Sequence, residues 1–537
     1  MNISMKAKYI LSSAILSGVL ATSCVDLDTA PMSAYVTTDQ KSEIYASDPT
    51  KAEAGVNGVF AQYSVYMAVT GSRHNDFGYP SIMLFTDTNG MDYVSQDNGY
   101  NWTGSSLEFS DRIYTSSDCK VVWNTMYSKI YTSNNVASTI VDPADPTNKF
   151  YLAQALASRA FDYWILAQLY QFNYADHKSS PCVPIITEEN ATQVALEGAP
   201  RATVEEVYAQ IMSDINKAID LLTAAQSEGV KRADKRYIDL AVAYGLRARV
   251  NLTMENWSAA AADAQAAINA SDATPYTIAQ VSKPAFMDSK DNAWMWGIVI
   301  AETDRVVTSG IVNWPSHMGS LSYGYANFSG GHQINKALFN KIPATDVRKG
   351  WWIDENCFSP NLDETQLYYV QDYCGYRPYT HVKFAPYNYE VDTSTNANDI
   401  PLMRIEEMYL IKAEAEAMAG NLAAGKATLE SFVQTYRNPE YTCAAASAQE
   451  MQEEVWFQRR VELWGEGLSW YDIMRLKKDI DRRGGGYPDV TMVFNIPYGS
   501  DIMLWRIPES EIQANAQIEE TDNNPSASLP ESVADIE

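Results

Sequence analysis

The chain has 537 residues and a formal net charge of −27, and 46% of its residues are hydrophobic. Because so acidic a chain repels phosphate backbones and no basic residues concentrate in one run, the composition argues against nucleic acid as a partner. The hydrophobic fraction is ample for a large core, in one large domain or several.

The first residues predict an export signal. Lys6 and Lys8 precede a short apolar run at 9–20, and small residues then lead to Cys24. A basic start, a short apolar run and a small-residue cleavage site are typical of exported proteins, which places the signal at residues 1–23. A cysteine at the cleavage point resembles a bacterial lipobox, with lipid on Cys24; an ordinary signal peptide that happens to hold a cysteine is the alternative.

The polar residues after Cys24 predict a lipidated tether over residues 24–38, followed by a single domain over 39–537. No later run approaches the roughly 18 apolar residues of a membrane-spanning helix. We therefore expect the protein to be anchored to a membrane by lipid alone, which several acyl chains can do firmly.

The other cysteines do not predict a disulfide framework, since their number is odd. Cys357 and Cys374 flank an aromatic segment and could bridge in an oxidising compartment. There is no C-x-x-C and no cluster of Cys and His, and we expect neither a metal nor a cofactor. The five are Cys119, Cys182, Cys357, Cys374 and Cys443.

Amphipathic helices are predicted along most of the chain. Apolar residues at helical spacing mark residues 123–140 and 152–170. The stretch 200–222 adds a capping box, because Thr203 stands at the N-cap position and Glu206 follows three residues later.

One helical pattern occurs twice, at residues 239–268 and 404–433, which align without a gap. Each copy is a helix with small residues on one face, a tight turn and a second alanine-rich helix, which resembles a tetratricopeptide unit. The aligned residues include Tyr244, Ala248 and Asn256 in the first copy and Tyr409, Ala413 and Asn421 in the second.

Two stretches, 71–111 and 271–400, break the helical rhythm and are rich in Gly, Asn, Tyr and Trp. Residues 296–302 within the second are strand-like. The predicted fold is therefore mainly α: a tetratricopeptide-like helical hairpin scaffold whose long irregular loops and few short strands form a ligand platform.

Residues 458–477, QRRVELWGEGLSWYDIMRLK, predict two short helical runs joined at glycines. Charges of both signs alternate there with core-type aromatics, and buried charges are tolerated only when they pair. We therefore expect an ion-paired junction between helices that does not touch a ligand. Its residues are Arg459, Arg460, Glu462, Gly465, Glu466, Trp470, Asp472 and Arg475.

This segment resembles the "RR.ELwgEg.RwyDL.RW" signature of the SusD/RagB family. Residues 155–170, 201–222, 399–415 and 504–525 resemble further elements of that family in the same order, so the resemblance extends over about residues 26–525. One departure is Ser469, where the family often has Arg. The resemblance implies a surface lipoprotein of the Bacteroidota outer membrane that binds nutrient without cleaving it and passes it to a SusC-like TonB-dependent transporter.

Aromatic rings on rigid loops stack on sugar rings, while planar polar side chains bond hydroxyl pairs, so the two irregular stretches hold the candidate binding residues. Trp102 and Trp314 rank first, because neither has an obvious local core to join. Packing of each ring against the scaffold is the alternative. The other candidates are Asp87, Asn89, Asp92, Tyr93, Tyr100, Asn101, His317, Tyr323, Tyr325 and Asn327; tryptophans 123, 164, 257, 464 and 470 are expected in the core.

The spacing Asp87-x-Asn89-Gly90-x-Asp92 faintly resembles a calcium loop. An EF-hand, however, needs glycine at its sixth position, and here it stands at the fourth. An Asx-rich turn is the plainer interpretation.

The predicted ligand is an oligosaccharide. Peptide capture is the first alternative, because the RagB branch of the family takes up peptides. A surface glycosidase is the second, although H-E-x-x-H, G-x-S-x-G and P-loop motifs are missing. We expect a protein that is not an enzyme.

Overall fold

The computed structural model describes residues 38–96 and 102–536. The predictions for the export signal, for Cys24 and most of its tether, and for Tyr100 and Asn101 lie outside these residues.

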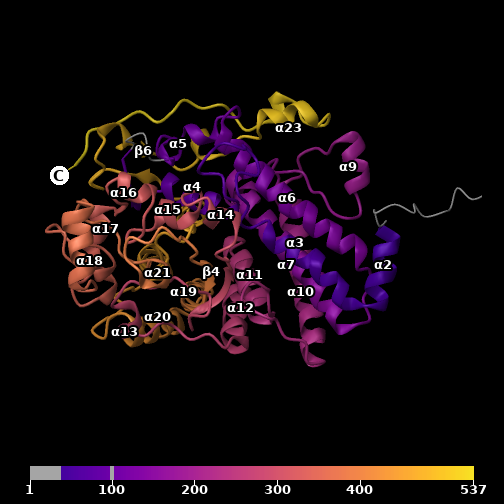
Figure 1. The fold of residues 1–537 in the computed structure, drawn as a ribbon, viewed down its shortest axis with the longest axis horizontal. Helices are drawn as coiled ribbons and strands as arrows, with labels where there is room; N and C mark the ends of the chain where they lie inside the picture. Colours follow the sequence, from indigo (N-terminus) through magenta and orange to yellow (C-terminus); the bar gives the residue numbers. More distant parts are fainter. Residues whose placement is uncertain (1–37, 97–101, 537) are drawn as a thin grey trace, which may run out of the picture.

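A set of helices forms a scaffold that runs through the molecule, and each packs against the next along the chain (Figure 1). These helix–helix contacts form the predicted helical scaffold. The scaffold helices are α3 (Glu53–Ala61), α6 (Ser117–Thr139), α7 (Pro146–Tyr170), α10 (Val204–Ser227), α11 (Leu240–Thr253), α12 (Trp257–Ala270), α19 (Ile405–Met418), α20 (Leu422–Tyr436) and α21 (Ala448–Glu462).

The predicted start of α10 is confirmed. Thr203 accepts a hydrogen bond from the Glu206 backbone N–H at 3.2 Å, and the Glu206 carboxylate accepts one from the Thr203 N–H at 2.8 Å. These reciprocal bonds satisfy N–H groups that a helix start leaves open.

The repeated pattern folds as two helical hairpins, α11–α12 and α19–α20, as predicted. Small residues let the paired helices approach closely. A Cβ atom at Gly425 would come within 2.5 Å of the Ala413 carbonyl oxygen.

We expect Gly425→Ala to lower the free energy of unfolding by about 1–3 kcal/mol, because the added methyl must push two helix backbones apart. This exceeds the gain of nearly 1 kcal/mol that alanine normally brings to a helix. Urea unfolding followed by circular dichroism measures the change. Gly245→Ala is the control, since its Cβ would meet the flexible side chain of Met403 instead. Equal effects of both substitutions would contradict the role assigned to the backbone approach.

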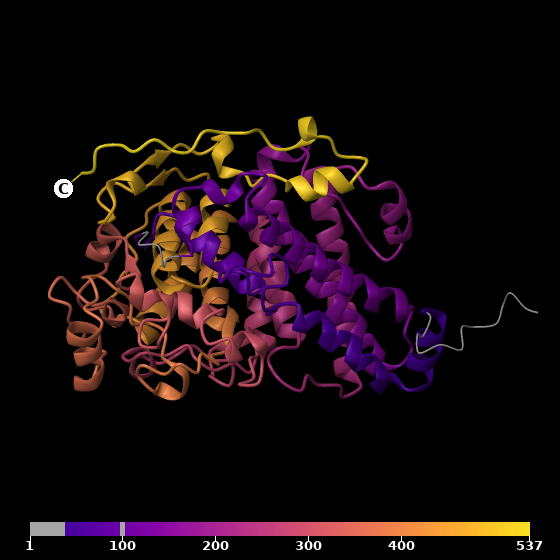
Figure 2. The same cartoon turned by 45° about the horizontal axis from the view of Figure 1, so that its top comes forward.

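Other helices surround the scaffold at both ends and along its edges (Figures 1 and 2). They are α2 (Thr38–Ser47), α4 (Tyr79–Asn89), α5 (Gly104–Leu107), α8 (Tyr174–His177), α9 (Ala191–Glu197), α13 (Ile278–Val281), α14 (Arg305–Thr308), α15 (Trp314–Met318), α16 (Tyr325–Phe328), α17 (Lys336–Lys341), α18 (Glu364–Tyr368), α22 (Ser469–Arg475) and α23 (Glu509–Ala514). Helix α4 corrects the prediction that residues 71–111 are irregular throughout.

In the described part of the chain, short strands form three antiparallel pairs: β1 (Tyr93–Val94) with β3 (Gln333–Ile334), β2 (Trp294–Ile298) with β4 (Ile400–Arg404), and β5 (Ile480–Asp481) with β6 (Asn495–Ile496). The first two pairs join segments that are distant in the sequence. The strand predicted at 296–302 is β2, which begins and ends earlier, at Trp294–Ile298. The pair β1–β3 connects the two irregular stretches, since Tyr93 lies opposite Ile334.

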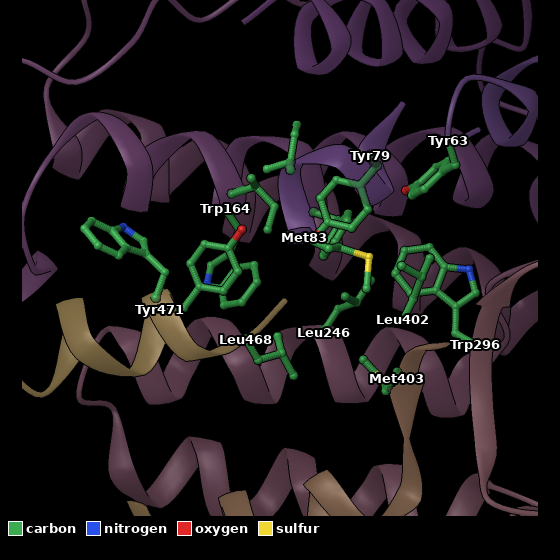
Figure 3. Close-up of a cluster of buried hydrophobic side chains, with 14 of the residues drawn as sticks. Tyr63, Tyr79, Met83, Trp164, Leu246, Trp296, Leu402, Met403, Leu468 and Tyr471 are labelled. Atoms are coloured by element: carbon green, nitrogen blue, oxygen red, sulfur yellow. The ribbon is translucent and has the colours of Figure 1, made fainter. Parts of the chain in front are cut away.

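The main core lies where the scaffold meets the strands and α22. Figure 3 shows Tyr79 and Met83 of α4 close to Leu246 of α11, with Trp296 and Leu402 from the strands beside them. Tryptophans 123, 164, 464 and 470 are buried as predicted, whereas Trp257 packs against the core and is only partly buried.

The five described cysteines are all free, so the possible bridge between Cys357 and Cys374 is not formed. Among the described residues, no helix has the length and apolar character needed to cross a membrane.

Candidate functional site

Four partly buried side chains lie close together. Two come from the loop before α4, one is Trp102, and one comes from α16. The ring of His74 lies 4.9 Å from that of Trp102, and Tyr325 stands edge-on to Trp102 at 6.0 Å. The Arg73 guanidinium lies over the same indole at 5.4 Å. His74 Nδ1 and the Tyr325 hydroxyl are hydrogen-bonded. We call Arg73, His74, Trp102 and Tyr325 the aromatic platform.

Two carboxylates hold the loop that carries Arg73 and His74 in place. Asp76 accepts hydrogen bonds from the backbone N–H groups of Val69 and Thr70 at 3.0 and 2.7 Å. Asp118, in the first turn of α6, accepts bonds from Arg73 at 3.4 Å and Asn75 at 2.9 Å. Burial raises the pKa of Asp118 to about 6, and the Arg73 charge opposes that rise.

Trp102 is held through its backbone, because Asn75 Nδ2 donates to the Trp102 carbonyl at 3.0 Å. The same Asn75 bonds Asp118, so one buried amide joins the two loops of the platform. Such hydrogen bonds keep the indole in place without covering all of its ring.

On the other side, α15 supports Tyr325. Ser316 Oγ accepts a hydrogen bond from the Tyr325 backbone N–H at 3.0 Å. His317 Nε2 bonds the His74 carbonyl at 2.9 Å, and its ring lies 5.0 Å from that of Tyr325. Burial lowers the pKa of His317 to about 3, so this imidazole is neutral at neutral pH. His317 therefore lies beneath the platform as a support.

The platform brings together Trp102 and Tyr325, which were candidates from the sequence, and Arg73 and His74, which were not. Both missed residues lie inside the irregular stretch 71–111, and that position was the only signal for them. A single Arg-His pair in a loop has no spacing that distinguishes a binding residue from a solvated one.

The structure corrects the prediction for Trp314. It is only 2% exposed and packs edge-on against Phe384 at 4.9 Å between ring centroids. The prediction that it lacks a core to join was wrong because its partner comes from a segment 70 residues away.

Asp87, Asn89, Asp92 and Tyr93 are also buried, which corrects their assignment to a binding loop. Asp87 and Asn89 lie in the last turn of α4, so this stretch is neither a calcium loop nor an isolated Asx turn. Asp87 accepts from the Gly467 N–H at 2.8 Å, and burial raises its pKa to about 7. Asn89 donates to the Ser106 carbonyl at 2.9 Å.

Tyr323 and Asn327 lie beside the platform. Tyr323 is exposed and meets Phe328 edge-on at 6.3 Å. Asn327 is used within the protein, since its Nδ2 donates to the Tyr369 hydroxyl at 2.8 Å and its Oδ1 accepts from Tyr376.

The segment 458–477 forms a buried ion-paired junction. Glu462 accepts hydrogen bonds from Arg437 at 2.7 Å, Arg404 at 3.1 Å and Arg348 at 3.3 Å. The other pairs join Glu466 to Arg404 and Lys383, Arg459 to Asp472, and Arg475 to Asp472 and Glu414.

Gly465 and Gly467 have φ of +78° and +75°, and a Cβ at Gly467 would come within 2.6 Å of Met83 Cβ. Glycine is therefore needed where the junction turns between α21 and α22. Trp470, just beyond this turn, is fully buried.

The junction also holds the segment that begins at Asp92. Arg460 Nε donates to the Asp92 carboxylate at 2.8 Å, and Trp464 Nε1 donates to the Asp92 carbonyl at 2.9 Å. Tyr93 stacks on Trp464 with ring centroids 5.9 Å apart. These contacts hold the start of the segment that leads to Trp102.

Solved structures share this fold. A SusD-like carbohydrate-binding protein from Bacteroides vulgatus is 24% identical, with a TM-score of 0.71 over 89% of this chain and 98% of that one. A SusD superfamily protein from the same species gives 0.70 at 18% identity over 89% and 99%. Surface glycan-binding protein A from Bacteroides thetaiotaomicron, in complex with laminarihexaose, gives 0.60 at 15% identity over 88% and 99%.

Two family models match the sequence itself. One, described as the SusD family, matches residues 352–525, which include the ion-paired junction. The other, described as starch-binding and associating with the outer membrane, matches residues 60–252, which include the loop of Arg73 and His74 and also Trp102. No curated protein sequence matches the chain. The two matched segments and the shared fold show that the chain belongs to the SusD/RagB family.

Proposed function

We propose that this protein captures a neutral glycan on the aromatic platform at the cell surface and delivers it to a SusC-like TonB-dependent transporter. The observation that carries the proposal is the pair of rings at the platform. Trp102 and Tyr325 are partly exposed, stand at 75° to each other and are held by buried hydrogen bonds. Rigid, partly exposed rings suit sugar C–H faces, because little side-chain freedom is lost on binding.

The polar side chains of the platform fit hydroxyl groups. Arg73 carries N–H donors, and His74 carries a ring nitrogen beyond the one that bonds Tyr325. Because Asp118 balances the charge of Arg73 and the whole chain is strongly acidic, a neutral glycan is favoured over a polyanionic one. The starch-binding description of the matched family and the laminarihexaose bound by the structural neighbour support this class of ligand.

Binding without cleavage is part of the proposal. Glycoside hydrolysis generally uses two carboxyl groups flanking the scissile bond. The four platform side chains include none, and the nearby Asp118 is buried and bonded to Arg73 and Asn75.

The membrane anchor and the transporter follow from the family. We propose that lipid on Cys24 holds the protein at the outer membrane, as the matched family's description supports. The scaffold side away from the platform would cover the transporter, and opening would swing about the N-terminal tether.

Trp102→Ala is expected to weaken glycan binding at least tenfold, because a central aromatic contact is worth about 2 kcal/mol or more. The test is affinity electrophoresis of the soluble chain, truncated after Cys24, in gels that contain starch, laminarin or other polysaccharides. Tyr131→Ala is the matched control, since Tyr131 is 65% exposed on α6, about 20 Å along the helix from Asp118.

Loss of retardation in Trp102→Ala alone would support both function and site. Unchanged retardation in that variant would discard the site. If no polysaccharide retards the wild type, peptide capture becomes the leading hypothesis. Release of reducing ends by the purified protein would contradict binding without cleavage.

A further inference from the structure

A further exposed ring, Tyr373, lies outside the platform and is connected to it through hydrogen-bonded neighbours. Tyr373 is 62% exposed, and its ring stacks on Tyr369 with centroids 5.3 Å apart and planes 21° apart. Tyr369 itself is buried. One face of the Tyr373 ring is therefore covered by a fixed neighbour, while the side chain as a whole remains mostly in solvent.

Hydrogen bonds connect the supporting ring to the platform. The Tyr369 hydroxyl accepts from Asn327 Nδ2 at 2.8 Å and donates to Asp392 Oδ1 at 3.0 Å. Asn327 lies in the same one-turn helix as Tyr325, two residues further along. The helix that carries Tyr325 of the platform is thus hydrogen-bonded to the ring that supports Tyr373.

The backbone under Tyr373 is unusual. Residues Tyr369–Tyr373 form a turn of π-helix, a rare conformation that is frequent at functional sites. Asp392, which receives the Tyr369 hydroxyl bond, has a left-handed backbone with φ of +63°. Non-glycine residues in this region cost about 1 kcal/mol or more, and such costs concentrate at binding and active sites.

Polar groups and further aromatic rings surround Tyr373. Gln371, Asp372 and Gly375 are exposed, and so are the rings of Tyr368 and Phe358. Exposed rings bordered by polar groups offer stacking surfaces together with partners for hydroxyl groups.

We infer that Tyr373 is a second stacking site for the same glycan, so that the protein selects chains of several sugars over short ones. This inference rests on the proposed function. The platform holds one part of the chain, and Tyr373 receives the sugars that extend past the end of α16, where Asn327 bonds Tyr369.

Calorimetric titration with maltotriose, maltoheptaose, laminaritriose and laminarihexaose tests the inference. The wild type is expected to bind a longer chain of at least one series more tightly than its triose. Tyr373→Ala should weaken binding of the longer chain about tenfold and leave the triose unchanged. Tyr373→Phe should retain the wild-type preference, because the stacking ring remains. Thermal melting checks that each variant is folded.

The outcomes separate this inference from the function on which it rests. If Trp102→Ala abolishes binding while Tyr373→Ala leaves the longer chain unaffected, the glycan site stands and the second stacking site is rejected. Equal losses for triose and longer chain in Tyr373→Ala also reject it, since the ring would then act on the platform itself. If neither series binds the wild type, the assignment to neutral glucans fails, and the inference fails with it.

Discussion

Glu462→Gln is expected to lower the free energy of unfolding by about 3–5 kcal/mol, because it removes the negative charge at the centre of the ion-paired junction. Arg348, Arg404 and Arg437 all bond this carboxylate, and all four side chains are fully buried. Without Glu462, the three carboxylates Asp346, Glu406 and Glu466 would face four buried cations, the three guanidinium groups and Lys383. One buried positive charge would then be left without a compensating partner.

The effect should depend on pH in a definite direction. Burial alone would raise the pKa of Glu462, but Arg437, Arg404 and Arg348 hold it well below its ordinary value of 4.5. A carboxyl group with a depressed folded-state pKa stabilises the protein above its unfolded-state pKa, and this contribution is lost as the pH falls through the folded-state pKa. The deficit of Glu462→Gln should therefore be full at neutral pH and shrink progressively below 4.5.

Urea unfolding of wild type and variant across this range measures both effects. Glu205→Gln, an exposed carboxylate in the first turn of α10, serves as the control and should change stability by less than about 1 kcal/mol. A Glu462→Gln deficit that stays the same at acidic pH would show that shape, and not charge, decides the effect.

The scaffold could be predicted because its signals are local. The capping box at Thr203 and the paired small-residue helices depend on neighbours within one or two turns, and the structure has both. The charge alternation at residues 458–477 was equally informative, since charges among core residues have few options besides pairing. What the sequence did not show is that the partners, such as Arg348 and Arg404, lie more than 50 residues away.

The site could be predicted only as a pair of loops. Trp102 and Trp314 stand in similar Gly-, Asn- and Ser-rich surroundings, yet one is partly exposed and the other is buried against Phe384. Asp87 and Asn89 resemble loop residues because they are polar and stand near the end of α4. Their hydrogen-bond partners, Gly467 and Ser106, lie in other segments of the chain. Exposure of a given ring is a tertiary property, and no local pattern encodes it.

The pair of Asp92 and Arg460 should matter for both stability and binding. Their side chains are only 6% and 14% exposed, so removing either partner leaves a largely buried charge without compensation, at a cost of about 3 kcal/mol. We expect Asp92→Ala and Arg460→Ala each to show this cost. The double variant should cost less than the sum of the two, with a coupling of about 1–3 kcal/mol.

Glycan affinity should follow the same pattern, because Asp92, which Trp464 also bonds, begins a segment that contacts the helix of Tyr325. Within that segment, Gln96 Nε2 donates to the Ser329 carbonyl at 3.3 Å, directly after α16. Either single substitution loosens that segment and is expected to weaken binding several-fold, even when the protein remains folded at the assay temperature. Denaturation of the four proteins gives the coupling, and affinity electrophoresis on the retarding polysaccharide gives the binding. Additive stability losses would mean that the two charges act independently. Unchanged binding in folded Asp92→Ala would show instead that Asn75, through the Trp102 carbonyl, is sufficient to place the indole.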